Sequence, residues 1–187
     1  MKIILASQSP RRIELLKQIT TDFEVIPTPV EETIDFNLTP GENAVALALK
    51  KAEWVSRHYK DRLVIGADTM VVLEGEIIGK PTDRNDAFTI LKRLGGKEHE
   101  VITGVAVING GTFKTATVST VAFKVLSDEE ILAYIDTGEP MDKAGAYAIQ
   151  GKGAFMVSGY QGSHTNIIGF PMETVRDLLC KAGYKFK

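Results

Sequence analysis

One segment governs how this chain begins to fold: Ile3-Ile4-Leu5-Ala6-Ser7-Gln8-Ser9-Pro10-Arg11-Arg12. Its apolar first half predicts a strand. Pro10 suits the first position of a helix that has Ser9 as its N-cap. Backbone N–H groups, the positive end of the helix dipole and two arginine side chains then meet at one place. Such a place favours a phosphate, although the same residues also fit a capped helix with solvated arginines.

The composition predicts a single domain over residues 1–187 that binds a small ligand. A length of 187 residues lies within the usual range of one domain. The net charge is -2, so there is no general positive field for long nucleic acid. The apolar start is too short for a signal peptide, and no apolar run approaches the ~20 residues of a membrane span. We therefore expect a cytoplasmic protein that binds neither membranes nor, stably, nucleic acid.

Helix and strand signals occur in mixed order and predict an α/β or α+β fold with a mixed sheet. Helices are predicted to start after Thr39, Asp83 and Ser127, of which the first and last match the capping box. Hairpin turns are predicted at Glu74-Gly75 and at Asn109-Gly110-Gly111. The predicted strands are residues 3–6, 23–27, 63–73, 101–108, 112–125 and 154–157.

Asp68 is the single carboxylate in a highly apolar strand, Val64 to Leu73. Burying an unpaired carboxylate is costly, so this residue must be paired, hydrogen-bonded, bound to a metal or placed beside a cleft. Functional carboxylates have this pattern, although an aspartate that caps a bend has it too. Lys80, which follows the hairpin predicted at Glu74-Gly75, could contact a phosphate or be solvated; the spacing of the glycines before it does not match a P-loop.

Two further segments are candidates for ligand contacts. Glu31 and Glu32 follow an extended stretch and could hold a metal beside a phosphate, although adjacent acids on a loop are also common on surfaces. Gln150 lies in a glycine-rich segment and could read the edge of a base, although a turn before a strand explains those glycines equally well. The three histidines are isolated and are expected to be structural or at the surface, and Cys180 is expected in the core.

Five segments together resemble the Maf family of nucleoside triphosphate pyrophosphatases. They occur in the family's order and spacing from residue 3 to the segment Ile168-Gly169-Phe170-Pro171. The resemblance implies an inosine-triphosphatase-like α/β fold, with an elongated mixed β-sheet flanked by helices and a cleft between two lobes. It also implies a cytoplasmic hydrolase that needs a divalent cation, Mg²⁺ or Mn²⁺, and that could form a homodimer. The segments are Ser7-Gln8-Ser9-Pro10-Arg11-Arg12, Gly66-Ala67-Asp68-Thr69, Gly79-Lys80-Pro81, residues 99–104 and residues 142–147.

The resemblance also implies roles for individual residues. Asp68 resembles the catalytic base and Lys80 a catalytic and phosphate-binding residue. Glu32 and Asp68 resemble the metal ligands. The implied phosphate ligands are Ser7, Arg11, Arg12 and Lys80, and the implied base-specificity residues are Arg11, Thr69 and Gln150.

The base-specificity positions resemble the subfamily that acts on dTTP and UTP, so we expect hydrolysis of these nucleotides, or of modified pyrimidine nucleotides, to the monophosphate and pyrophosphate. This would be a house-cleaning activity, with a possible link to cell division. Two alternatives stay open: a pyrophosphatase for 7-methyl-GTP, and a nucleotide-binding regulator of septum formation without significant turnover.

Overall fold

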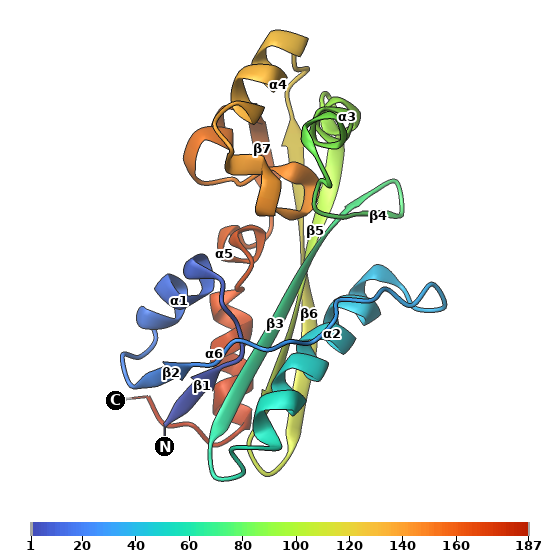
Figure 1. Cartoon of the computed structure of the whole chain (residues 1–187). Coiled ribbons are helices and arrows are strands. Elements are labelled where there is room, and N and C mark those ends of the chain that lie inside the picture. Colours follow the sequence, from blue (N-terminus) through green and yellow to red (C-terminus); the bar gives the residue numbers. More distant parts are fainter. Residues whose placement is uncertain (1, 187) are drawn as a thin grey trace. The chain divides into compact units, whose positions relative to one another are not determined.

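The protein is an α/β protein with helices and strands mixed along the chain, in a computed structural model that describes residues 2–186 (Figure 1). None of its helices within that range is long and apolar enough to cross a membrane. In chain order the elements are β1 (Ile3–Leu5), α1 (Pro10–Lys17), β2 (Phe23–Val25), α2 (Pro40–Ser56), β3 (Leu63–Leu73), β4 (Glu76–Ile78), α3 (Arg84–Leu94), β5 (Glu98–Ile108), β6 (Thr112–Phe123), α4 (Asp128–Ile135), the 3₁₀ helices η1 (Glu139–Asp142), η2 (Ala144–Ala146) and η3 (Gly151–Met156), β7 (Val157–Gln161), α5 (His164–Ile168) and α6 (Met172–Lys181).

The strands form one mixed sheet. Their hydrogen-bonded order is β2-β1-β3-β5-β6-β7, with β4 beside β3. β1 is parallel to β2 and β3, whereas β4 and β7 are antiparallel to β3 and β6. The predicted α/β class with a mixed sheet flanked by helices is therefore confirmed.

Contacts within the chain divide it into two compact units. The first unit consists of Met1–Thr69, Thr103–Thr117 and Gly169–Lys187, and the second of Met70–Ile102 and Val118–Ile168. Strands β3, β5 and β6 each contribute one part to each unit. Each unit has its own apolar cluster.

In the first unit, α2 packs unusually closely on β3 and β5. Ala48 and Ala52 of α2 are fully buried in an apolar cluster with residues of β1 and β3. A Cβ atom added to Gly66 of β3 would clash with the helix backbone at Ala48, and one added to Gly104 of β5 would clash with it at Ala44. The two glycines therefore allow an approach that no residue with a side chain would permit.

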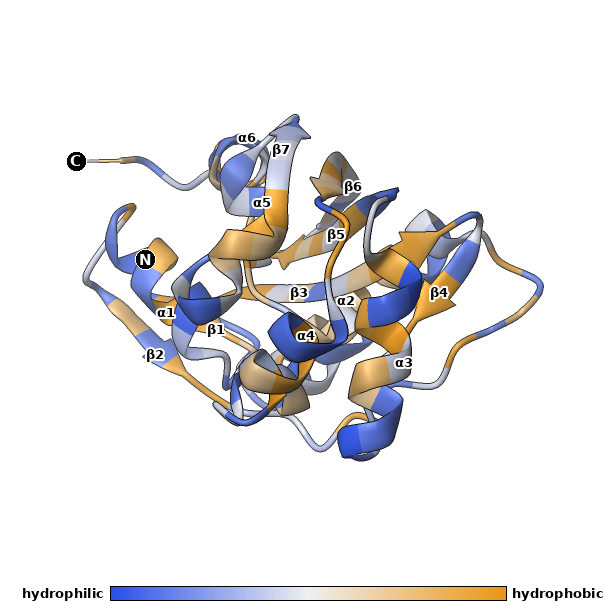
Figure 2. Ribbon diagram, turned by 90° about the horizontal axis from the view of Figure 1, so that it is seen from above, coloured by the Kyte–Doolittle hydropathy of each residue, from blue (hydrophilic) through white to orange (hydrophobic). Residues whose placement is uncertain are grey.

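In the second unit, α3 and α4 pack beside each other. Helix α3 has hydrophobic and hydrophilic stretches along its ribbon (Figure 2) and buries Ala87, Ile90, Leu91 and Leu94. Ion pairs link the exposed sides of the two helices, such as Lys92 with Asp128 at 2.6 Å. Because exposed pairs contribute ~0–1 kcal/mol, the buried apolar faces supply most of the energy that holds these helices together.

The predicted helix starts and hairpin turns are confirmed. Thr39 and Ser127 form complete capping boxes, and the Asp83 side chain caps α3. The Asn109 N–H donates to the Gly111 carbonyl at 3.0 Å in the hairpin between β5 and β6. Glu74 and Gly75 both have positive φ, 53° and 83°, as the tight turn between β3 and β4 requires.

Three local predictions need correction. The strand predicted at 154–157 is a 3₁₀ helix over Gly151–Met156, and β7 begins only at Val157, where pairing with Phe123 starts. Ser9 occupies the N-cap position of α1, but its side chain makes no capping bond. Cys180 is exposed rather than in the core, because the buried face of α6 passes through Val175, Leu178 and Leu179 instead.

His99 lies in the interior of the second unit, as a structural residue. It is 2% exposed, and its Nε2 atom is 2.7 Å from the Tyr147 hydroxyl. Its ring meets those of Phe123 and Tyr147 edge-on. Burial lowers the pKa of His99 to about 4, so the imidazole stays neutral in the folded protein at neutral pH.

We predict that this histidine makes stability depend on pH. As pH falls from about 6.5 to about 4, the unfolded chain binds a proton at His99 that the folded chain does not. The free energy of unfolding should therefore decrease by about 3 kcal/mol over this window on account of this residue. Urea unfolding at several pH values should show that His99→Gln removes this part of the decrease.

The matched control is His58→Gln, which changes an exposed histidine. It should keep the pH dependence of the unchanged protein. Equal pH dependence in the His99→Gln variant and the unchanged protein would contradict the prediction.

Candidate active site

The candidate site in the first unit is centred on Lys51, whose ammonium group joins two carboxylates. Lys51 Nζ donates to Asp68 Oδ1 and to Glu32 Oε1, each at 2.6 Å. The Lys51 and Asp68 side chains are 9% and 10% exposed, whereas that of Glu32 is 47% exposed. Glu31 instead accepts a bond from Lys50 through its backbone carbonyl. Of the two adjacent glutamates, Glu32 is therefore the one whose carboxylate shares a partner with Asp68.

The close contact of α2 with β3 explains why Asp68 meets Lys51. Residues two apart in a strand lie on the same face, so Asp68 lies on the same face of β3 as Gly66, which faces α2. Residues three and four apart share one face of a helix, so Lys51 lies beside Ala48 and Ala52 on the face that α2 presents to β3. The two charged groups are thus buried in one apolar contact and pair there.

Asp68 combines deep burial with incomplete pairing. Burial raises its pKa above the usual value, while the charges of Lys51 and Arg12 and the bond from Lys51 act in the opposite direction. Within residues 2–186, its second oxygen, Oδ2, accepts no hydrogen bond. A carboxylate with a raised pKa and one uncommitted oxygen is suited to accept a proton.

Arg12 is held by four hydrogen bonds on the other side of β3. Its Nε donates to the Gly169 carbonyl at 2.9 Å, and Nη1 donates to the Ala67 carbonyl at 2.9 Å and to Ser7 Oγ at 3.3 Å. Its Nη2 donates to Thr69 Oγ1 at 3.0 Å. The guanidinium group therefore connects the loop after β1, the strand residues that flank Asp68 and the segment before α6.

Arg11 has no such partners. Its Nε atom is buried and makes no hydrogen bond with any described residue. Buried polar atoms in folded proteins are nearly always paired. The Nε–H group of Arg11 is therefore suited to donate a hydrogen bond to a ligand oxygen. The first turn of α1 contains no acidic residue, and its N-cap side chain makes no capping bond, which leaves the helix start suited to an anion.

The other predicted site residues are distributed as follows. Thr69 Oγ1 accepts the bond from Arg12, is 3.0 Å from Thr103 Oγ1 and is 3.5 Å from the Gly169 carbonyl oxygen. Lys80 and Gln150 belong to the second unit, where both are exposed. The first unit thus brings together Ser7, Arg11, Arg12, Glu32, Asp68 and Thr69.

Sequence reasoning missed Lys51, although the chain contains a signal for it. Helix α2 buries Leu47, Ala48, Ala52 and Val55 at helical spacing, and Lys51 falls within that apolar stripe. A lysine in a buried stripe requires a partner, for the same reason that an aspartate in an apolar strand does.

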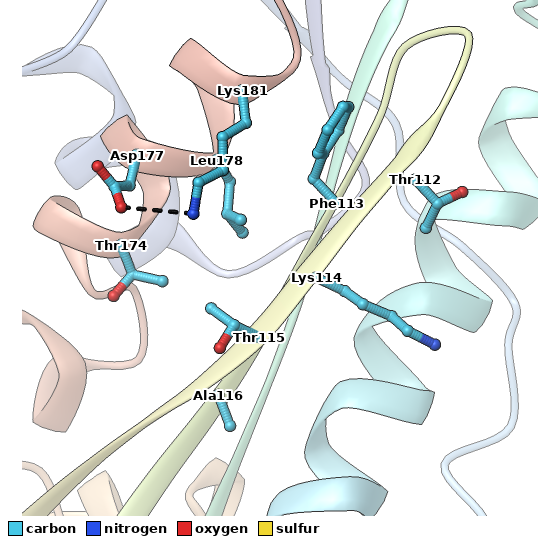
Figure 3. A pocket seen from close by; sticks show the side chains of 9 residues that line it. All are labelled: Thr112, Phe113, Lys114, Thr115, Ala116, Thr174, Asp177, Leu178 and Lys181. Atoms are coloured by element: carbon cyan, nitrogen blue, oxygen red, sulfur yellow. Dashed lines mark ion pairs between the residues drawn. The ribbon is translucent and has the colours of Figure 1, made fainter.

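A shallow groove also lies in the first unit, between β6 and α6, with a volume of about 550 Å³ (Figure 3). Lys181 and Asp177 pair across one turn of α6 at 3.7 Å beside it. None of its described lining residues is a predicted site residue. The groove is therefore separate from the cluster around Asp68.

We predict that Arg12 stabilises the fold whereas Arg11 does not. Arg12→Lys keeps the positive charge but cannot preserve four forked hydrogen bonds, so the free energy of unfolding should fall by about 1–3 kcal/mol. Arg11→Lys, the matched control on the next residue, should change it by less than about 0.5 kcal/mol. Denaturant unfolding measures both values, and equal losses would contradict the assignment.

Comparison with known proteins shows which family the chain resembles. Residues 2–182 match the family described as Maf-like protein. A dTTP/UTP pyrophosphatase from Caldicellulosiruptor saccharolyticus is 48% identical over 98% of this chain and 96% of its own length. A second one, from Dictyoglomus turgidum, is 50% identical over 98% of this chain and 97% of its own length.

A solved structure, that of the Staphylococcus aureus Ham1 protein, resembles this chain in fold. It has a TM-score of 0.50 and 19% identity, over 84% of this chain and 80% of that chain. The match over nearly the whole sequence and the high identity to curated relatives lead to one conclusion: this chain belongs to the Maf-like protein family.

Proposed function

We propose that this protein hydrolyses dTTP and UTP to the monophosphate and pyrophosphate. The observation that carries the proposal is the buried Asp68 carboxylate, which has one oxygen bound to Lys51 and one uncommitted. The names of the curated relatives, dTTP/UTP pyrophosphatase, support the substrate class. A cytoplasmic location and a homodimer are parts of the proposal that rest on the family resemblance.

Asp68 would act as the general base. Its Oδ2 would accept a proton from the water that attacks the α-phosphorus, as the bond from phosphorus to the bridging oxygen breaks and pyrophosphate leaves. Lys51 would hold the carboxylate in place through Oδ1 and favour its ionised form. Lys51 would thus offset part of the cost of burying the charged base.

The start of α1 would bind the phosphates. The unpaired Nε of Arg11 and the uncapped first turn supply donors and positive potential. The Ser7 hydroxyl accepts bonds from the Ser9 N–H and from Arg12, so its own hydrogen is still available to a phosphate oxygen. Arg12 would act mainly by positioning, because its bonds go to the protein.

The residues around Lys51 fit a divalent cation. Glu32 and Asp68 supply carboxylate oxygens that share one partner, and magnesium bound to a nucleotide takes one or two protein carboxylates besides phosphate oxygens and water. A bound Mg²⁺ or Mn²⁺ would offset negative charge on the phosphate oxygens. In the described part of the chain, no group of three or more acidic, histidine or cysteine side chains could hold a metal ion without further ligands.

Three roles in the proposal rest on the resemblance. Lys80 would offset charge on the phosphates as a point charge. Thr69 and Gln150 would contribute to base preference together with Arg11. The amide of Gln150 offers both a donor and an acceptor, which is what the edge of a pyrimidine requires.

We predict that Asp68→Asn lowers turnover at least ~100-fold while nucleotide binding is largely kept, because asparagine has nearly the same shape but cannot accept the proton. Pyrophosphate release should be measured with dTTP, UTP, CTP, GTP and 7-methyl-GTP in the presence of Mg²⁺ or Mn²⁺. Only dTTP and UTP should be hydrolysed efficiently.

Asp61→Asn is the matched control, since it removes an exposed carboxylate of the same unit. If the Asp68→Asn variant turns over substrate at the same rate as the control, Asp68 is not the general base. Binding without turnover across the panel would favour the regulatory alternative, and preferred hydrolysis of 7-methyl-GTP would assign the chain to the other substrate class.

We further predict a change in pH dependence in Lys51→Met. Removing the ammonium group should raise the pKa of Asp68 further, so a smaller fraction of the base is ionised at a given acidic pH. The acid limb of the profile of kcat/KM against pH should therefore move to higher pH. Lys50→Met is the control, because Lys50 is exposed and bonds a backbone carbonyl instead. Superimposable profiles for Lys51→Met and the unchanged enzyme would contradict the role of Lys51.

A further inference from the structure

Glu139 has an unusual set of partners in the second unit. Its carboxylate accepts the Lys152 N–H at Oε2, at 3.0 Å, and the Gly153 N–H at Oε1, at 3.1 Å. The Tyr134 hydroxyl donates to Oε1 at 3.0 Å. One carboxylate of η1 thus binds two consecutive backbone N–H groups of η3, and α4 supports it.

These two N–H groups belong to the first turn of η3, where backbone donors lack partners within the helix. The side chain of the residue before a helix commonly satisfies such donors. Here that residue is Gln150, and its side chain makes no capping bond. Glu139 therefore caps the helix in its place and leaves the amide of Gln150, which is exposed, available for other contacts.

The turn at Gly151 is shaped to the same carboxylate. Gly151 has φ +85°, and a Cβ atom there would lie 2.9 Å from Glu139 Oε2. A residue with a side chain would be strained in this conformation and would also press on the carboxylate. Burial acts to raise the pKa of Glu139, but the hydrogen bonds and Lys143 outweigh it and lower the pKa, so the carboxylate stays ionised at neutral pH.

We propose that Glu139 is a positioning residue for base selection: by capping η3 in place of Gln150, it fixes the turn that presents the Gln150 amide to the base. The inference rests on the proposed function, because it takes Gln150 as the residue that contacts the base. No covalent step involves Glu139 itself, and its effect passes entirely through the backbone of residues 150–153.

The test is Glu139→Gln in the full-length protein, since an amide has one acceptor oxygen where the carboxylate has two. Exchange of the Lys152 and Gly153 amide hydrogens, measured by NMR, should become at least ~10-fold faster. The ratio of kcat/KM for dTTP to that for dCTP should fall toward its value in Gln150→Ala, while kcat for dTTP changes less. Glu98→Gln, which removes an exposed carboxylate of the same unit, should change neither quantity.

The double variant Glu139→Gln with Gln150→Ala separates the possible explanations. If Glu139 acts through Gln150, the double variant should have the same base preference as Gln150→Ala alone. If amide exchange in Glu139→Gln becomes faster but the base preference does not change, the proposal is overturned. It is also overturned if exchange of the Lys152 and Gly153 amides in this variant does not change. Unchanged base preference in Gln150→Ala would instead overturn the proposed role of Gln150, and the exchange rates would still report whether Glu139 holds the turn.

Discussion

The close approach of α2 to the sheet is the constraint on which the candidate site depends. Gly66 and Gly104 remove the side chains that would hold the helix away, and the small residues Ala44 and Ala48 form the helix side of the contact. At this separation Lys51 Nζ lies 2.6 Å from Asp68 Oδ1. A helix displaced outward by a side chain at Gly66 would leave a buried carboxylate unpaired, which is strongly unfavourable. The fold and the chemistry of the site therefore depend on the same contact.

In this buried region, charged side chains are stabilised by opposite charges nearby rather than by water. Arg12 and Asp68 influence each other electrostatically from opposite faces of β3, so each favours the charged form of the other. Burial acts against both charges, lowering the pKa of Arg12 and raising that of Asp68. The buried ion pair of Lys51 with Asp68 contributes little net stability compared with apolar residues of the same size. Its presence is understandable if the carboxylate has a chemical task.

The sequence predicted the fold well where local signals decide structure. The helix starts at Thr39, Asp83 and Ser127 and both hairpins follow from capping and turn chemistry, which involve residues close together in the chain. Residues that meet across the fold were harder to predict. Asp68 stood out because it interrupts an apolar strand, but its partner Lys51 is 17 positions away and was identified only once the packing of α2 was known.

Two adjacent arginines show why residue type alone could not assign roles. Consecutive residues in a helix point about 100° apart, so Arg11 and Arg12 cannot both face the sheet. Arg12 is directed to the carbonyls of Ala67 and Gly169, whereas the Nε of Arg11 has no partner in the described chain. The sequence predicted two phosphate ligands because two guanidinium groups occur together. The direction of each side chain, which depends on where α1 lies against β3, suggests one ligand and one positioning residue.

Arg12 and Glu139 each use a charged side chain to bond backbone polar groups, Arg12 as a donor and Glu139 as an acceptor. Arg12 donates to carbonyl oxygens of segments far apart in the sequence, and Glu139 accepts from two neighbouring N–H groups. In each case a charged side chain satisfies backbone groups that would otherwise need water, and charge-assisted bonds are stronger than those between neutral groups. Segments fixed in this way can present a neighbouring residue, Asp68 in one unit and Gln150 in the other, without using that residue's own side chain for support. Asp68 Oδ2 and the amide of Gln150, the groups with proposed chemical roles, thereby make no hydrogen bond with the described chain.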